Sequence, residues 1–315
     1  MSKEIGKIAV FGAGIMGHGI AQVCAQAGKA VTLVDSVEAM LASGRAGMEK
    51  SLGMLIDNGL LPGVDAAQAM ANVRFTTDLA QAAEGADLLF EAIPEKLELK
   101  QRLIAQLDQA CRPDTIFASN TSAMPIGSLA KASRHPERVI GTHFFNPAQL
   151  IPLVEVVPNE KTSAAVIEQV LRFLTAVGKK PIHVKKDLPG FLANRLQHAL
   201  GREAVSLVQK GIASAEDVDT AFKSSLAIRL IFSGPVEQRD LNGLDTYIGI
   251  TKTLYPDLED TKETPPIAAE MVTQGHLGLK TGKGFYDWTG QDPAEVSARK
   301  GRQLVRLLKF LKTLD

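Results

Sequence analysis

The stretch Lys7–Asp35, KIAVFGAGIMGHGIAQVCAQAGKAVTLVD, decides the fold of the N-terminal part of the chain. It contains an apolar run, a glycine-spaced turn, apolar residues at helical spacing and a second apolar run that ends in an acid. This order predicts a strand, a helix and a second, parallel strand. The glycines at 12, 14 and 17 match G-x-G-x-x-G. In that motif the first permits a tight turn, the second lets a pyrophosphate approach the backbone, and the third lets the helix pack on the strand.

The context of the three glycines favours a dinucleotide site over a purely structural turn, which would explain most chance matches. The phosphates would lie at the N-terminus of the helix, where free N–H groups and the helix dipole stabilise an anion. Asp35 lies about 20 residues beyond the glycines, where an acid can bind the ribose hydroxyls. The predicted contacts are Gly12, Gly14, Ile15, Met16, Gly17 and Asp35.

Length and composition bound the class of protein. The 315 residues suggest about two domains, and 35 Lys plus Arg balance 35 Asp plus Glu. This balance gives no reason to expect nucleic acid or an acidic membrane surface as a partner. No apolar run has the length of a membrane span, and MSKEIGK leaves no room for a signal peptide before the first strand. With only two cysteines and no C-x-x-C spacing, we expect a cytoplasmic protein with reduced thiols.

Beyond Asp35 the apolar pattern alternates between helices and strands. Helices are expected at 37–58, 64–70, 97–110 and 163–177, and strands at 73–78, 86–93, 115–119, from 139, at 153–157 and within 179–187. The breaker cluster Asp187-Leu188-Pro189-Gly190 marks the predicted domain boundary. A long helix from Phe191 through Leu207 and shorter ones at 243–250 and 264–272 follow. The sequence predicts an α/β protein with a Rossmann-type, doubly wound, mostly parallel sheet and an inserted helical hairpin in residues 1–187, then an all-α domain in 188–315.

His143 is the candidate base, because it ends a predicted strand at the sheet edge where ligands bind in open α/β folds. A lone histidine is more often a core residue bonded to backbone. Glu155, however, lies in an apolar strand, where an unpaired carboxylate is costly to bury. If the two strands are neighbours, Glu155 can hold the imidazole tautomer so that His143 accepts a proton. Ser122 and Asn194 could then bind the reacting oxygen. The alternatives, that Ser122 is only a turn residue and Asn194 only a residue on a helix surface, stay open. No metal-ligand spacing is present among the histidines.

Five segments resemble successive motifs of the L-3-hydroxyacyl-CoA dehydrogenase family, in the same order and over nearly the whole chain. They are GAGIMGHGIAQVCAQAG, SNTSAMPI, GTHFFNPAQLIPLVEVVP, DLPGFLANRLQHAL and GLKTGKGFYDW. The resemblance implies an NAD cofactor, a homodimer formed through the helical domain, and a role in fatty acid metabolism. It also implies that His143 and Glu155 act as a pair, that Ser122 and Asn194 bind the 3-hydroxyl, and that Glu95, Lys100 and Asn120 lie along the cofactor.

Other segments depart from the commonest family pattern. IRLIFSGPVEQRDLNGLD and LIDNGLLPG are closer to the branch that resembles λ-crystallin and L-gulonate dehydrogenase, which oxidises free 3-hydroxy carboxylates. The sequence therefore predicts a 3-hydroxyacyl-CoA or 3-hydroxybutyryl-CoA dehydrogenase. The alternatives are a dehydrogenase of a free 3-hydroxy carboxylate, such as L-gulonate or carnitine, and a non-catalytic crystallin-like module. Between Lys50 and Arg74 the hairpin has no lysine or arginine, so we expect it to contribute little to binding the phosphates of coenzyme A.

Overall fold

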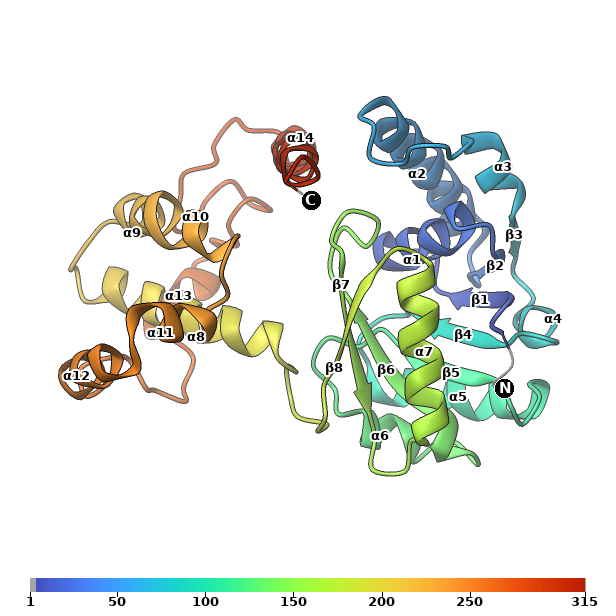
Figure 1. Cartoon of the computed structure of the whole chain (residues 1–315). Coiled ribbons are helices and arrows are strands. Elements are labelled where there is room, and N and C mark those ends of the chain that lie inside the picture. Colours follow the sequence, from blue (N-terminus) through green and yellow to red (C-terminus); the bar gives the residue numbers. More distant parts are fainter. Residues whose placement is uncertain (1–3, 315) are drawn as a thin grey trace. The chain divides into compact units, whose positions relative to one another are not determined.

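A computed structural model describes residues 4–314. The described residues up to Asn194, together with those from Gly301 on, form one compact unit, and Arg195–Lys300 form a second. Figure 1 labels the helices and strands of both units.

The first unit is built on one eight-stranded sheet. Its strands are β1 (Lys7–Phe11), β2 (Ala30–Val34), β3 (Val73–Thr76), β4 (Leu88–Glu91), β5 (Ile116–Ser119), β6 (Val139–Phe144), β7 (Leu153–Pro158) and β8 (Lys180–His183). Their order across the sheet is β3-β2-β1-β4-β5-β6-β7-β8. Every neighbouring pair is parallel except β6 and β7. This is the predicted Rossmann-type, mostly parallel sheet. The strand order proceeds from β1 towards β2 and β3 on one side and from β4 towards β5 on the other, so the switch point at which such sheets bind ligands lies between β1 and β4.

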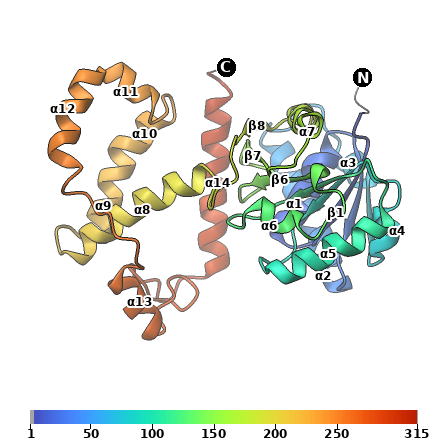
Figure 2. The same ribbon diagram turned by 90° about the horizontal axis from the view of Figure 1, so that it is seen from below.

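Helices cover both faces of the sheet (Figure 2). They are α1 (Ile15–Gln26), α2 (Glu38–Asp57), α3 (Ala66–Ala71), α4 (Leu79–Ala83), α5 (Leu97–Ala110), α6 (Ile126–Ala130), the 3₁₀ turn η1 (Pro136–Arg138) and α7 (Ala164–Ala176). One core packs α1, α2 and α7 on strand residues such as Ile8 and Val10, and the other packs α4, α5 and α6 on Ala9 and Phe11. Because adjacent side chains of a strand point to opposite faces, the near-continuous apolar strands supply both cores.

The predicted hairpin is formed by α2 and α3, and its turn packs against the end of the chain. Leu55 and Leu60 of the hairpin form a buried cluster with Leu150 and with Val305 of α14 (Pro293–Leu311). We call these four residues the Leu150 cluster. In addition, the ammonium group of Lys312 donates a hydrogen bond of 2.8 Å to the carbonyl of Leu60. The C-terminal half of α14 is therefore part of the first unit.

The second unit is helical, as the sequence predicts, and α8 leads into it. Its elements are α8 (Ala193–Gln209), α9 (Ala215–Ala221), the π-helical turn η2 (Phe222–Leu226), α10 (Ala227–Leu230), α11 (Glu237–Asn242), α12 (Leu244–Leu254) and α13 (Pro266–Thr273). The expectation that the long helix includes Phe191 and Leu192 is wrong. Phe191 has a φ of 48°, outside the helical region, and the helix begins only at Ala193. Among the described residues, none of the helices combines the length and apolarity needed to span a bilayer.

Candidate active site

The glycine turn between β1 and α1 has the backbone that the motif requires. Gly12 has a φ of 99°, which favours glycine, and a Cβ there would lie 2.6 Å from the carbonyl oxygen of Ala92. At Gly17 a Cβ would lie 1.6 Å from the carbonyl oxygen of Gly12, so the helix can pack on the strand only without a side chain. Nothing lies within 4 Å of a Cβ built on Gly14, which is the N-cap of α1. The backbone is thus open at the position where a pyrophosphate would approach.

A pocket of about 780 Å³ opens beside this turn. Of the predicted cofactor contacts, Gly12, Gly14, Ile15, Met16 and Asp35 line it. Gly17, Glu95, Lys100 and Asn120 are not in this lining. The carboxylate of Asp35 accepts hydrogen bonds from the backbone N–H groups of Ala13 (2.9 Å) and Val37 (3.0 Å), so it also anchors the turn. An apolar pocket whose lining includes a helix N-terminus and the Asp35 carboxylate fits a dinucleotide, with Asp35 available to a ribose.

His143 and Glu155 lie opposite each other in the antiparallel pair β6 and β7. The distance from His143 Nδ1 to Glu155 Oε2 is 2.8 Å, and both side chains are buried. Among the described residues no hydrogen-bond partner of His143 Nε2 is found, so this nitrogen is available for proton transfer. The ring also packs against Phe145, with ring centroids 4.4 Å apart, and against Phe191 at 5.7 Å. The carboxylate and the two aromatic rings together restrain the orientation of the imidazole.

The other oxygen of Glu155 holds the chain that leads into α8. Oε1 accepts hydrogen bonds of 2.9 Å from the backbone N–H groups of Leu192 and Ala193. Burial alone would raise the pKa of Glu155, but the bond from His143 and the two backbone donors outweigh it and lower the pKa. The carboxyl is therefore ionised at neutral pH, and His143 Nδ1–H donates to it. The sequence offered no sign of these backbone bonds beyond the breaker cluster that precedes them.

Ser122 and Asn194 are brought together although 72 positions separate them. Asn194 Nδ2 donates a 2.9 Å hydrogen bond to the carbonyl of Ser122, which lies in the loop after β5. Both residues are partly or fully exposed to solvent. Asn120 in the same loop is buried, and its Oδ1 accepts a bond of 2.8 Å from the N–H of Phe144, next to His143. The loop after β5 and the end of β6 are thus tied to each other at the carboxyl edge of the sheet.

A buried network that the sequence analysis missed supports this loop. Glu91 at the end of β4 accepts bonds from Lys100 Nζ (2.7 Å), Ser119 Oγ (2.6 Å) and the N–H of Ile93 (2.8 Å). Lys100 is only 1% exposed, and its Nζ also lies 3.1 Å from Glu95. The sequence does contain one sign of this network, because Glu91 is a charged residue at the end of an otherwise apolar strand and needs a buried partner.

Glu95 links this network to the loop that carries Ser122. Its Oε1 accepts the N–H of Ser122 at 3.0 Å and the hydroxyl of Thr121. Burial would raise the pKa of Glu95, but the bond from Thr121 and the charge of Lys100 outweigh it, so the pKa is lowered. Glu95 and Lys100 therefore connect the strand end beside the glycine turn to the backbone of Ser122.

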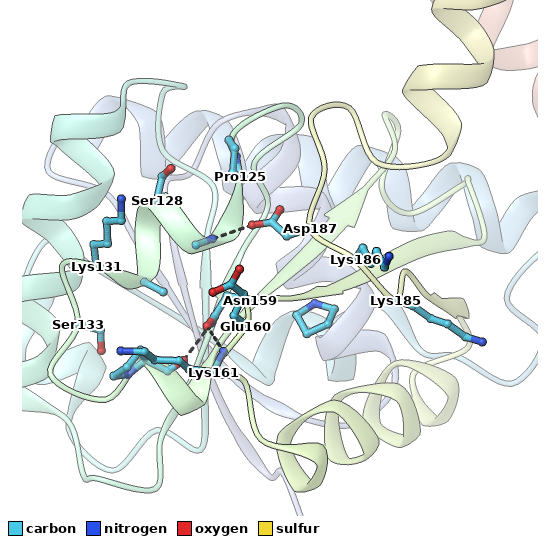
Figure 3. Close-up of a pocket in the computed structure, with 14 residues that line it drawn as sticks. Pro125, Ser128, Lys131, Ser133, Asn159, Glu160, Lys161, Lys185, Lys186 and Asp187 are labelled. Carbon is cyan, nitrogen blue, oxygen red and sulfur yellow. Dashed lines mark hydrogen bonds between the residues drawn. The ribbon is translucent and has the colours of Figure 1, made fainter.

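A second large pocket, of about 920 Å³, has neither His143 nor Glu155 in its lining (Figure 3). Its lining includes Pro158, which pairs with Ile140 at the start of β6, whereas His143 is near the end of that strand. Exposed Lys131 and Lys161 stand at its border. The end of the pocket at Pro158 is therefore at the opposite edge of the sheet from His143.

Comparisons with known proteins agree with this geometry. The model of the 3-hydroxyacyl-CoA dehydrogenase NAD-binding domain matches residues 7–188, and the model of the C-terminal domain of the same family matches residues 190–288. A probable 3-hydroxybutyryl-CoA dehydrogenase of Deinococcus radiodurans is 40% identical over 284 residues, which are 90% of this chain and all of the relative. The solved (S)-3-hydroxybutyryl-CoA dehydrogenase of Ralstonia eutropha has 35% identity and a TM-score of 0.75, covering 91% of this chain and all of its own.

Another relative covers more of the chain. The 5-formyl-3-hydroxy-2-methylpyridine 4-carboxylate 5-dehydrogenase of Mesorhizobium japonicum is 34% identical over 309 residues, 98% of this chain and 99% of the relative. A solved structure of an enzyme of that name, described as an NAD⁺-dependent dismutase, has a TM-score of 0.91, 34% identity and the same coverage. The two matched domains, the open glycine turn and the NAD-dependent relatives lead to one conclusion: the chain belongs to the 3-hydroxyacyl-CoA dehydrogenase family of oxidoreductases, and its cofactor is NAD.

Proposed function

We propose that this protein oxidises the 3-hydroxyl of an L-3-hydroxyacyl substrate to the 3-keto product. The main support is the buried His143–Glu155 pair at the carboxyl end of β6. A proton acceptor at that edge stands where the open sheet receives its ligands. Ser122 and Asn194, joined by their hydrogen bond, are the proposed contacts of the substrate oxygen. Glu95, Lys100 and Asn120 are proposed to support the part of the cofactor beyond the glycine turn.

In the proposed mechanism His143 is the general base. With Nδ1–H committed to the Glu155 carboxylate, Nε2 has a free lone pair and takes the proton of the 3-hydroxyl. The C3–H bond breaks with its electron pair as the C3=O bond forms, and NAD, when bound, supplies the hydride acceptor. Glu155 stabilises the imidazolium that results, because its negative charge already lies against Nδ1.

The oxidation of a 3-hydroxyl and the chemical class of the substrate that carries it are separate proposals. A carrier thioester is the first candidate, since relatives at 35–40% identity are named for 3-hydroxybutyryl-CoA. A free carboxylate, such as L-gulonate or carnitine, is the second, and the near-complete match to an enzyme named for a pyridine carboxylate favours it. We propose a cytoplasmic setting and, for the thioester candidate, a place in fatty acid metabolism. A non-catalytic crystallin-like module would not need the buried His143–Glu155 pair.

Turnover of a substrate panel tests the proposed function. We expect NADH to form when the protein and NAD are mixed with L-3-hydroxybutyryl-CoA or with a free L-3-hydroxy carboxylate, measured by absorbance at pH 8 to 9. The reverse reaction, acetoacetyl-CoA with NADH, is the more sensitive assay if the oxidation equilibrium is unfavourable. The L form should be oxidised and the D form should not, because the base and the hydride acceptor must lie on fixed sides of C3. No turnover of any member of the panel would favour the non-catalytic module.

We propose that two chains dimerise through the helical unit. Ile228 is 56% exposed, Phe232 63% and Val236 78%, and these large apolar side chains follow one another in a short stretch. Monomers rarely expose so many neighbouring apolar groups, so a second copy is the proposed cover. Light scattering at micromolar concentration should give twice the chain mass of 33.7 kDa.

A variant pair makes the dimer test specific. The double change Ile228→Asp and Phe232→Asp should convert the protein to monomers, because two carboxylates cannot be buried at an interface without partners. Ile182→Asp is the control, since Ile182 is an exposed apolar residue on β8 of the first unit. A single-chain mass for the unmodified protein, or a dimer that survives the double change, would contradict this assignment.

A further inference from the structure

The C-terminal half of α14 carries a basic stripe beside the hairpin. From residue 301 to residue 312 the sequence GRQLVRLLKFLK has four cations and no acid. Val305 is buried in the Leu150 cluster, which turns one face of the helix toward the hairpin. At 100° per residue, Lys309 and Arg306 follow Val305 at about 40° and 100° around the helix axis, so both lie on the same side of the contact face. Both are exposed, and among the described residues neither has a hydrogen bond or an ion pair.

The part of the hairpin against which this stripe lies, residues 51–73, has no cation of its own. From Ser51 through Val73 it contains Asp57 and Asp65 and not one lysine or arginine. The contact is direct, since Lys312 Nζ donates to the Leu60 carbonyl and Val305 packs with Leu55 and Leu60. The expectation drawn from the hairpin sequence alone, that phosphates would gain little there, therefore changes. In the folded unit, α14 supplies positive charge at the place where the hairpin lacks it.

The stripe is also connected to the candidate active site. Leu150 belongs to the Leu150 cluster and lies only seven residues after His143, a segment that spans at most about 25 Å when fully extended. Gln149 in the same segment donates a 3.1 Å bond to Ser51 of α2, which holds the segment against the hairpin. The segment that follows His143 therefore leads directly to the Leu150 cluster, in which Val305 of α14 takes part.

This helix lies outside the matched family domains. The C-terminal family model ends at residue 288, and the Deinococcus relative is covered completely by 284 aligned residues, whereas α14 begins at Pro293. The stripe thus lies outside the matched domains, although the alignment with the Mesorhizobium japonicum relative, which spans 98% of this chain, includes it.

We propose that Arg306 and Lys309 of α14 bind the phosphate groups of a carrier thioester, with its acyl end at His143. This inference rests on the proposed function and names the carrier-bearing member of its substrate class. Phosphate groups fit because guanidinium and ammonium donors form charge-assisted hydrogen bonds to them. A free 3-hydroxy carboxylate has no group that would reach the stripe. Binding energy at such a remote group can be used to lower the barrier at the reacting carbon.

The test compares two thioesters that differ only in the phosphate-bearing part. Acetoacetyl-CoA and acetoacetyl-pantetheine are reduced with NADH at low salt, and the ratio of their kcat/KM values is measured. We expect a ratio of at least tenfold in favour of acetoacetyl-CoA, falling at least tenfold in the double variant Arg306→Glu and Lys309→Glu. In this variant the kcat/KM for acetoacetyl-pantetheine should stay within twofold of its value in the unmodified protein. Raising the salt concentration should reduce the ratio in the unmodified protein, because exposed charges are screened.

A matched double variant controls for the change of net charge. Lys131→Glu and Lys161→Glu alter the charge of the same unit equally, at the border of the second large pocket (Figure 3). This control should leave the ratio unchanged. An equal loss on both thioesters in the Arg306 and Lys309 variant would overturn the proposal, because it would mean that α14 only supports the fold. A ratio near one in the unmodified protein would overturn it as well.

Calorimetric titration with coenzyme A separates this inference from the proposed function. We expect binding to the unmodified protein and a Kd at least tenfold weaker in the Arg306 and Lys309 variant. If no member of the substrate panel is turned over, the proposed function is wrong, while this titration still decides whether α14 binds the phosphates. If the enzyme oxidises free carboxylates and does not bind coenzyme A, the function stands and the α14 proposal is wrong.

Discussion

Replacement of His143 by glutamine is expected to lower kcat by a factor on the order of 10²–10⁴, the usual contribution of a general base. Glutamine can still donate a hydrogen bond to Glu155, so the buried carboxylate keeps a partner, but it has no basic nitrogen to take the proton. Steady-state kinetics with the best substrate of the panel measures the loss. The NAD dissociation constant should hardly change, since His143 is not among the residues that line the pocket beside the glycine turn.

His183→Gln is the control for this change. His183 lies at the end of β8 in the same unit and is exposed, so its replacement should keep full activity. Glu155→Gln should also lose much of the rate while the fold persists, because an amide oxygen can still accept the N–H groups of Leu192 and Ala193. A His143→Gln variant with more than a tenth of the original kcat would show that another group is the base.

Gly17→Ala is expected to destroy the cofactor site and to destabilise the first unit. The added Cβ would lie 1.6 Å from the Gly12 carbonyl oxygen. The strand and the helix cannot separate to make room for it without disrupting the core that packs on α1. Overpacking in a well-packed core usually costs about 1–3 kcal/mol. Because this clash is with backbone, we expect a loss of more than about 3 kcal/mol in the free energy of unfolding. Urea unfolding and NAD titration measure the two effects.

Gly14→Ala is the matched comparison. A Cβ there meets nothing within 4 Å, so the protein should fold with a stability within about 1 kcal/mol of the original. The methyl group would nevertheless occupy the space through which a pyrophosphate approaches the backbone, so NAD affinity should fall at least tenfold. A Gly17→Ala protein that is as stable as Gly14→Ala and binds NAD equally well would contradict the assigned roles of the two glycines.

The order of elements in the first unit could be predicted because it is written in local patterns. Apolar runs, helical spacing and the glycine turn of Lys7–Asp35 specify strand, helix and strand within a few residues, and the observed β1, α1 and β2 agree with them. The strand before the glycine turn and the helix after it can each be predicted from neighbouring residues alone. The apolar Phe191 and Leu192 predict too early a start for the helix after Gly190. The distant Glu155 carboxylate instead binds the backbone N–H groups of Leu192 and Ala193, and the φ of Phe191 is positive.

By itself, the sequence determined the Rossmann-type fold and named His143, Glu155, Ser122 and Asn194 as candidates, but not how they meet. Spacing along the chain left it open whether the strands of His143 and Glu155 are neighbours, and only the antiparallel register of β6 and β7 sets the two side chains opposite each other. Likewise, residues 51–73 of the hairpin lack cations. Only tertiary packing brings α14 from about 250 residues away to the hairpin turn. Local structure depends on short-range propensities and steric rules, which a sequence displays. Pairing between distant segments depends on the burial and charge of the whole core, which no single stretch contains.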